Sequence, residues 1–234
     1  MHELTPGELF SMLIESNIID STGQITMTLN GTSVTVKSTD TIGNNIQEWL
    51  AEWLRTNEIY FETPDNTQNF PDFYLSRNTR EKSLLEIKSY FAPRKPAFDV
   101  ANFDSYINSV ASHPYRLDAD YMIFAYDLDD GVLKIRKLFL KKVWEITGKS
   151  TDYELTCQRK NGQVYNIRPN SFNSLRSNLP VFSCKEEFVA ALYKEYRNKT
   201  NQVAVARQWL HTVLEGYRDF SGEDISTRVY NLIR

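Results

Sequence analysis

A short apolar strand that carries two charged side chains constrains the fold of this chain more than any other feature. Residues 83–90 read SLLEIKSY, an aliphatic and aromatic run of the kind that forms β-strands. Side chains alternate between the two faces of a strand, so Glu86 and Lys88 project from one face and Ile87 from the other. Charged residues are uncommon inside such strands unless they serve a purpose. We therefore expect a sheet on which a carboxylate and an ammonium group lie side by side.

A second carboxylate precedes this strand. Residues 70–76 read FPDFYLS and predict another strand, which opens with Pro71-Asp72. Two neighbouring strands can bring Asp72, Glu86 and Lys88 to one point. Carboxylates are the hard oxygen ligands that Mg²⁺ takes while it keeps several waters. Phosphodiester hydrolysis needs such a cation to polarise a phosphoryl oxygen and acidify a water, and it needs positive charge near the scissile phosphate.

The remaining periodicity predicts an α/β chain. An apolar strand at 120–126 follows a predicted helix at 98–110, and Ile46, Leu50 and Leu54 recur at helical spacing before the charged strand. The expected order is α-β-β-β-α-β, with a mixed central sheet, flanking helices and a C-terminal α/β extension. The other predicted elements are helices at 8–18, 185–198 and 202–217, strands at 58–63 and 132–140, a β-ribbon at 24–37, a hairpin at 153–168 and a polar loop at 169–180.

Charge and composition narrow the function classes. The 234 residues carry a formal net charge of −3, which gives no overall support to nucleic-acid binding. Residues 157–234 hold 12 Lys and Arg against 7 Asp and Glu, net +5, and residues 1–156 are therefore −8. The basic part is compatible with binding to a polyanion, although a solvated helix surface gives a similar imbalance.

The cysteines and histidines lack the spacing of metal ligands, which disfavours a zinc site. No apolar run approaches the ~18 residues of a membrane span, and we expect a cytoplasmic protein.

The charged motif resembles that of the PD-(D/E)xK nucleases. Pro71-Asp72, Glu86-Ile87-Lys88 and the order of elements over residues 43–140 carry the resemblance. It implies that Asp72 and Glu86 bind metal while Lys88 assists the nucleophile. It also implies that Glu48, on the helix before the strands, is a further catalytic acid, and that the cofactor is Mg²⁺ with Mn²⁺ as a substitute. The alternatives are a surface salt bridge between Glu86 and Lys88 and a solvated helix face around Glu48.

Size and loop content favour one branch of these nucleases. A compact core with added polar loops is typical of a type II restriction endonuclease, and residues 43–48 and the total length resemble the NgoBV and NlaIV type. The resemblance implies hydrolysis of double-stranded DNA that leaves 5′-phosphate ends, a homodimer, and a cognate DNA methyltransferase in the same system. We expect one compact domain of three parts: an N-terminal helix and ribbon over 1–42, the catalytic core over 43–150, and an extension over 151–234 that contributes DNA recognition and dimer contacts.

Two stretches supply candidate DNA contacts. The catalytic strand continues into residues that can meet a phosphate backbone, and the predicted loop is rich in Arg and Asn, which pair with guanine and adenine edges. A charged surface loop and a solvated linker are the respective alternatives. The candidates are Ser89, Tyr90, Arg94, Lys95, Arg168, Asn170, Asn173, Arg176 and Asn178.

Three other functions remain open at this point. The first is a repair or recombination nuclease of the same fold, which would not cut plain duplex DNA at a fixed sequence. The second is a catalytically inactive DNA-binding protein, against which the intact Asp72, Glu86 and Lys88 argue. The third is a globular protein whose motif is coincidental, and such a protein would show no metal dependence.

Overall fold

The computed structural model describes residues 1–66, 69–174 and 179–234. The chain divides into two compact units, of which unit 1 comprises residues 1–96 and 119–141 and unit 2 comprises residues 97–118 and 142–234. The three-part division expected from the sequence stays a prediction. Among the described residues, no helix combines the length and the apolar character needed to cross a bilayer.

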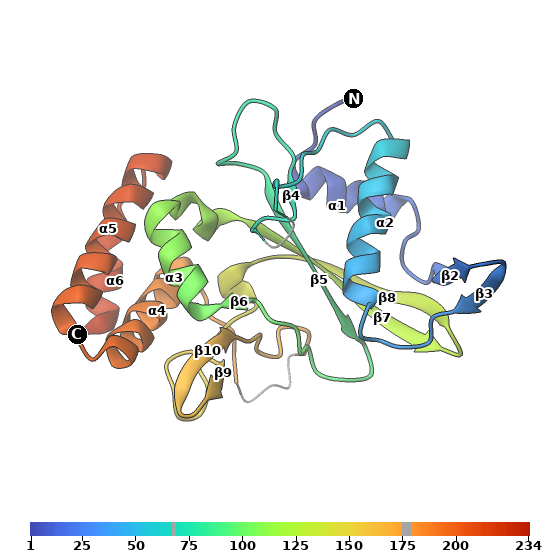
Figure 1. Ribbon diagram of the computed structural model, residues 1–234. Coiled ribbons are helices and arrows are strands. Elements are labelled where there is room, and N and C mark those ends of the chain that lie inside the picture. Colours follow the sequence, from blue (N-terminus) through green and yellow to red (C-terminus); the bar gives the residue numbers. More distant parts are fainter. Residues whose placement is uncertain (67–68, 175–178) are drawn as a thin grey trace. The chain divides into compact units, whose positions relative to one another are not determined.

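A mixed five-stranded sheet is the centre of unit 1 (Figure 1). The strand order is β1-β8-β7-β5-β4, with β5 parallel to β7 and antiparallel to β4. The parallel ladder runs from Leu85↔Asp120 to Phe91↔Tyr126. This confirms the mixed α/β sheet expected from the sequence. The strands are β1 (Thr22–Gln24), β4 (Phe73–Tyr74), β5 (Leu84–Phe91), β7 (Asp120–Asp129) and β8 (Val132–Lys142).

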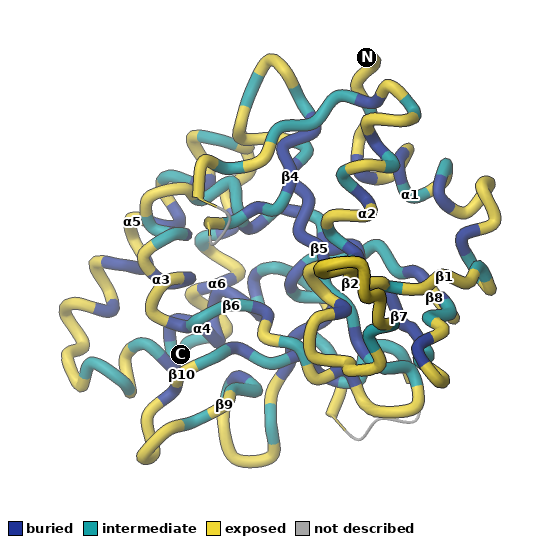
Figure 2. Tube along the Cα trace, turned by 45° about the vertical axis from the view of Figure 1, so that its right-hand side comes forward, coloured by how far each residue is buried: buried dark blue, intermediate teal, exposed yellow. Residues whose placement is uncertain are grey.

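Two helices cover one face of this sheet. They are α1 (Pro6–Glu15) and α2 (Ile42–Thr56), and the buried residues of α2 recur every four positions as an apolar stripe. That stripe shares one core cluster with Leu85 and Ile87 of β5. A Cβ atom on Gly43 of α2 would lie 3.4 Å from the Ser89 Oγ. The helices therefore pack on the Leu85, Ile87 and Ser89 face, and Glu86 and Lys88 belong to the opposite face; Figure 2 shows β5 as a largely buried strand.

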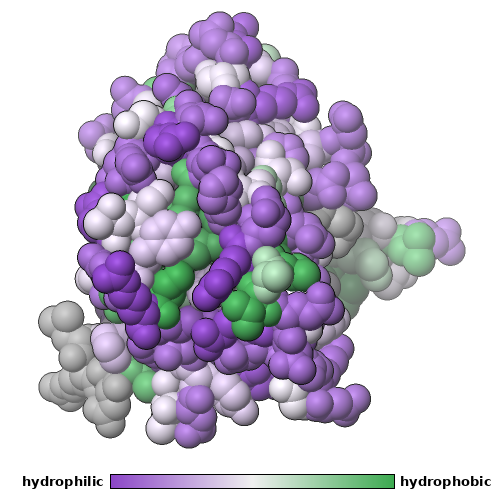
Figure 3. Space-filling view, turned by 90° about the vertical axis from the view of Figure 1, so that its left-hand side faces the viewer, coloured by the Kyte–Doolittle hydropathy of each residue, from purple (hydrophilic) through white to green (hydrophobic). Residues whose placement is uncertain are grey.

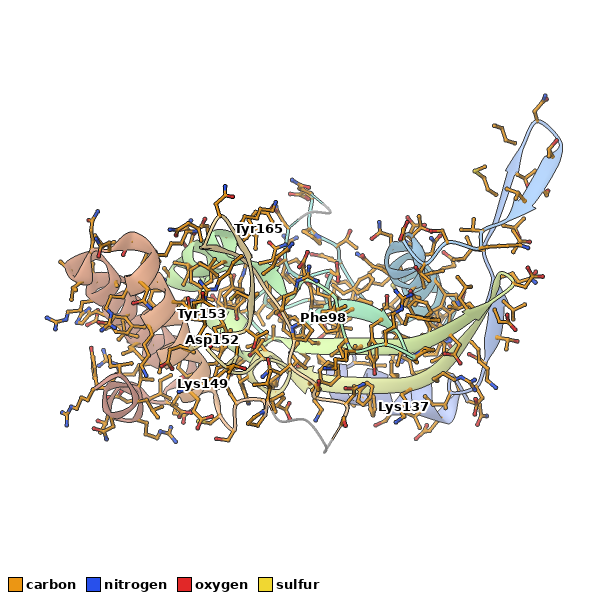
Figure 4. The ribbon with its side chains drawn as sticks, turned by 90° about the horizontal axis from the view of Figure 1, so that it is seen from below. Phe98, Lys137, Lys149, Asp152, Tyr153 and Tyr165 are labelled. Atoms are coloured by element: carbon orange, nitrogen blue, oxygen red, sulfur yellow. The ribbon has the colours of Figure 1, made fainter. Side chains whose placement is uncertain are left out.

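A two-stranded ribbon, formed by β2 (Thr26–Leu29) and β3 (Thr32–Thr35), extends away from the rest of unit 1 (Figure 4). Asn30 and Gly31 turn the ribbon with φ of 47° and 75°, the positive pair that a two-residue hairpin loop of this kind requires. In the register Met27↔Val34 and Leu29↔Thr32, one face carries the large apolar side chains and the other carries hydroxyls. The ribbon is thus amphipathic although both of its faces are solvent-accessible.

Unit 2 joins a small sheet to a group of helices. Its sheet has the order β6-β10-β9, and β9 and β10 form the hairpin expected near Asn161-Gly162. The elements are β6 (Ala101–Asn102), α3 (Phe103–Ser112), β9 (Cys157–Lys160), β10 (Gln163–Ile167), α4 (Lys185–Thr200), α5 (Val203–Ser221), α6 (Ser226–Ile233) and two short 3₁₀ helices, η1 (Pro114–Asp118) and η2 (Val143–Glu145).

Some predicted boundaries are wrong. The expected strand at 58–63 forms only single bridges at Ile59 and Glu62, and Glu58 enters it with a φ of 56°, outside the β region. The expected helix at 98–110 begins at Phe103, because Asn102 caps it through an oxygen that accepts from the Ser105 N–H. Helix α6 was not predicted.

Candidate active site

The antiparallel pairing of β4 with β5 sets the position of the first carboxylate. Phe73 lies opposite Leu85 and Tyr74 opposite Leu84, so one further step along the register places Asp72 opposite Glu86. The next residue, Pro71, has no N–H with which to continue the ladder. The Asp72 side chain replaces the missing ladder hydrogen bond, because its Oδ2 accepts the Ile87 N–H at 2.6 Å. A backbone group of the central strand thus holds the Asp72 carboxylate in place.

Glu86 and Lys88 lie on one face of β5, as the alternation predicts. The Lys88 Nζ is 2.8 Å from the Glu86 Oε1, and the two side chains are 19% and 11% exposed. The other Glu86 oxygen, Oε2, is buried and has no hydrogen-bond partner among the described residues. Because a buried carboxylate oxygen normally has a donor or a cation beside it, this oxygen is available as a ligand.

Aromatic rings form part of the surroundings of these acids. The parallel register places Tyr121 of β7 next to Glu86, and the Phe70 ring lies 6.2 Å from the Tyr121 ring, centroid to centroid. Burial, and secondarily the nearby Glu86 carboxylate, raise the pKa of Asp72 to about 7 despite the Ile87 N–H and Lys88, which act in the opposite direction. Sequence reasoning gave Tyr121 and Phe70 no role, since only the β5–β7 pairing brings Tyr121 to the site.

This arrangement has the chemistry of a two-carboxylate cation site with an adjacent ammonium group. Among the described residues, no cluster of three or more His, Cys, Asp or Glu is placed to hold a metal ion. A cation held by Asp72 and Glu86 would therefore take its remaining ligands from water and substrate, as Mg²⁺ commonly does. Lys88 would carry positive charge at the edge of that site.

Glu48 is not brought to this cluster. It is exposed on α2, the helix that packs on the opposite face of β5 from Glu86 and Lys88, and no contact joins its described side chain to theirs. Its neighbour Glu52 forms an ion pair with Arg55 at 2.8 Å. The catalytic role of Glu48 stays a prediction.

The candidate DNA contacts in unit 1 differ in their accessibility. Tyr90 is buried, and Ser89 lies on the α2 side of β5. Arg94 and Lys95 are exposed after the end of β5, where the Arg94 guanidinium lies 5.9 Å from the centre of the Phe91 ring. Only Arg94 and Lys95 are therefore freely accessible to a phosphate backbone.

The candidates in unit 2 include two side chains that bind the protein itself. The Arg168 guanidinium donates to the Ala97 carbonyl at 2.7 Å and lies 3.0 Å from the Asp99 carboxylate. Asn170 is 5% exposed, and its Nδ2 donates to three backbone carbonyls, including that of Pro180 at 2.9 Å. In this structure neither side chain is free to read a base.

The other loop candidates are Asn173, which is partly exposed, and Arg176 and Asn178, which lie outside the described residues. Their role in reading bases stays a prediction.

Comparisons with known proteins identify the family of the chain. The family model of the NgoBV restriction endonuclease matches residues 3–234. The type II restriction enzyme NlaIV of Neisseria lactamica is 40% identical over 230 residues, 97% of this chain and 94% of the relative. The type II restriction enzyme NgoBV of Neisseria gonorrhoeae is 38% identical over 162 residues, 68% of this chain and 92% of the relative.

A solved structure of the NlaIV restriction endonuclease superposes with a TM-score of 0.90 at 38% identity, covering 97% of this chain and 94% of that one. The chain therefore belongs to the NgoBV restriction endonuclease family and is a DNA endonuclease.

Proposed function

We propose that this restriction endonuclease hydrolyses the phosphodiester bonds of double-stranded DNA with Mg²⁺, for which Mn²⁺ can substitute, and leaves 5′-phosphate ends. Enzymes of this kind generally use a divalent metal ion. The observation that carries the proposal is the approach of Asp72 and Glu86 on neighbouring strands beside the Lys88 ammonium group.

The residues present fit a small divalent cation. Glu86 offers a buried oxygen that has no hydrogen-bond partner among the described residues. Burial raises the pKa of Asp72, and repulsion from the nearby Glu86 carboxylate adds to this rise. A divalent cation would relieve that repulsion, and carboxylate oxygens are the ligands that Mg²⁺ prefers. Asp72 and Glu86 are therefore the proposed metal ligands.

Asp72, Glu86 and Lys88 would have different roles in the reaction. A bound divalent ion would polarise the scissile phosphate and lower the pKa of a water. The Ile87 N–H holds the Asp72 carboxylate at a fixed point, and β5 presents Glu86 and Lys88 from one rigid strand. Lys88 would stabilise the negative charge that grows on the phosphate and orient the attacking water, because its ammonium group donates hydrogen bonds without moving far from Glu86.

DNA contacts are proposed for two places. Arg94 and Lys95, exposed beyond the end of β5, would bind the phosphate backbone. Base reading is proposed for the loop over residues 169–180, where Asn173, Arg176 and Asn178 would supply the paired hydrogen bonds to base edges. Arg168 and Asn170 would support the loop through their contacts with backbone carbonyls.

We propose in addition that two copies act together and that a cognate DNA methyltransferase protects the host's own sites. One catalytic cluster per chain and two strands to cut favour a two-fold dimer. Support for a self-association surface comes from the β2–β3 ribbon, on which Met27, Leu29 and Val34 are 57%, 72% and 52% exposed on one face. Residues 24–36 contain no charged side chain, so this face is suited to another apolar face and poorly suited to DNA.

Metal dependence tests the proposed reaction itself. Purified protein should convert plasmid DNA to a fixed set of fragments, lose this activity in EDTA, and regain it with Mg²⁺ or Mn²⁺ and not with Ca²⁺, whose larger and looser ligand shell does not fit. Gel electrophoresis of the products and end-labelling of their 5′-phosphates give the measurement. Full activity in EDTA, or recovery with zinc alone, would contradict the two-carboxylate site.

Lys88→Ala should lower the single-turnover cleavage rate by about 100-fold or more while DNA affinity changes little, because Lys88 acts on the scissile phosphate and reads no base. The matched control is Lys82→Ala, an exposed lysine in the loop before β5. Quenched-flow cleavage and gel-shift assays separate the two effects. A near-normal rate for the Lys88 variant would remove this residue from the mechanism.

Asp72→Asn should stabilise the metal-free protein above neutral pH. The pKa of Asp72 rises from 3.8 to about 7 on folding, so the folded state holds the proton more tightly, and ionisation destabilises the fold as the pH rises between these values. The asparagine has no charge, and its oxygen can still accept the Ile87 N–H. We expect a gain of about 1–3 kcal/mol at about pH 8 and little gain at about pH 4, measured by urea unfolding in EDTA. An equal loss of stability at both pH values would contradict the burial of a repelled carboxylate.

Replacing Met27, Leu29 and Val34 together by threonine should convert the dimer to a monomer, because threonine keeps the β-propensity of the ribbon and removes its apolar face. Thr28→Ser, on the hydroxyl face, is the control. Sedimentation velocity gives the result. A monomeric wild-type protein would contradict the homodimer, and a dimeric triple variant would place its interface elsewhere.

A further inference from the structure

A groove in unit 2 lies outside everything described so far. Residues of helices α4, α5 and α6 line an open groove of about 780 Å³. Figure 3 views the side of unit 2 on which these helices lie, and it shows apolar side chains gathered in hollows between hydrophilic ones. The residues that give the groove its chemistry are Tyr193, Arg197, Arg207, His211, Tyr230 and Arg234.

The charged side chains that line the groove are positive. Arg197, Arg207 and Arg234 are exposed, and no aspartate or glutamate is among the lining residues. One lining residue, His211, contacts a carboxylate: its Nδ1 lies 3.0 Å from the Glu215 Oε2. Three guanidinium groups therefore share one groove with no acidic side chain among the lining residues.

Other arginines of unit 2 are neutralised within the protein. Arg159 pairs with the buried Glu195, and Arg228 pairs with Glu186, each with an N–O distance of 2.8–2.9 Å. Among the described ion pairs, none includes the three arginines of the groove. Like charges gathered without a partner destabilise a fold through their mutual repulsion, so their clustering favours an anionic ligand from outside the unit.

We propose that this groove binds the phosphate backbone of duplex DNA. The inference rests on the proposed function, because DNA is the polyanion that the enzyme must hold. It adds contacts separate from the catalytic cluster, since the groove consists of unit 2 residues and Asp72, Glu86 and Lys88 belong to unit 1. Arginine is well matched to phosphate oxygens, and the exposed Val203 and Tyr230 offer apolar surface to the sugars. An acidic peptide is the other polyanion of this charge, and the test separates it from DNA.

The test is the salt dependence of binding to a non-cognate duplex in EDTA, followed by fluorescence anisotropy. The variant replaces Arg197, Arg207 and Arg234 together by glutamine. Each phosphate contact contributes about 0.9 to the slope of log affinity against log salt, so the triple variant should lose about 2–3 from this slope and bind about 10-fold or more weakly at low salt. Unchanged thermal unfolding would show that the variant is folded.

Arg218→Gln is the matched control, because Arg218 is an exposed arginine of α5 that lies 3.7 Å from Asp219 and does not line the groove. This variant should keep the wild-type slope. The inference is overturned if the triple variant keeps the wild-type slope, if the Arg218 variant loses as much, or if only binding to polyglutamate declines.

Cleavage of plasmid DNA by the wild-type protein reports on the proposed function independently of this result. Absence of cleavage by the wild-type protein would reject the proposed function, while the salt slopes would still decide the role of the groove.

Discussion

The hydrogen bond from the Ile87 N–H to the Asp72 carboxylate is the contact on which the site depends. β4 pairs with β5 over only two residues, and Pro71 cannot extend the ladder. The Asp72 side chain lies beside β5 just beyond the paired residues of β4 and accepts the N–H of the buried Ile87. A structural requirement of the sheet, that its central N–H groups be paired, thus fixes the position of a proposed metal ligand.

The same geometry makes the site unstable in electrostatic terms without a cation. Asp72 and Glu86 are opposite each other beside aromatic rings, and the Lys88 ammonium group, which lies against one Glu86 oxygen, does not keep the pKa of Asp72 from rising. Sites that hold cations often carry such a cost, because the charges that repel each other in the empty protein are those that bind the ligand. The packed stripe of α2 against the other face of β5 offsets this cost with apolar burial.

The periodicity of the sequence was sufficient to predict which side chains share one face of the same strand or helix. The alternation in residues 83–90 placed Glu86 and Lys88 on one face, and the four-residue spacing predicted the buried stripe of α2. It did not show that α2 packs on the opposite face from these charges, which leaves Glu48 away from them. Nor did it show that Arg168 and Asn170 bind backbone carbonyls, since a loop sequence does not reveal which polar groups it must satisfy. Tyr121 and the arginines of the groove come together only through tertiary pairing.

The two units differ in net charge in a way that suits the proposed reaction. Unit 1 holds 12 Lys and Arg against 17 Asp and Glu, net −5, whereas unit 2 holds 15 against 13, net +2. Carboxylates that bind a metal ion also repel the phosphates that the metal must reach, so a nuclease gains little affinity for DNA from the acids themselves. In the proposed mechanism this affinity comes from cations that are not metal ligands, such as Arg94, Lys95 and the arginines of the unit 2 groove. An enzyme with the proposed contacts would bind DNA before its metal site is filled, and the metal would then control cleavage without controlling binding.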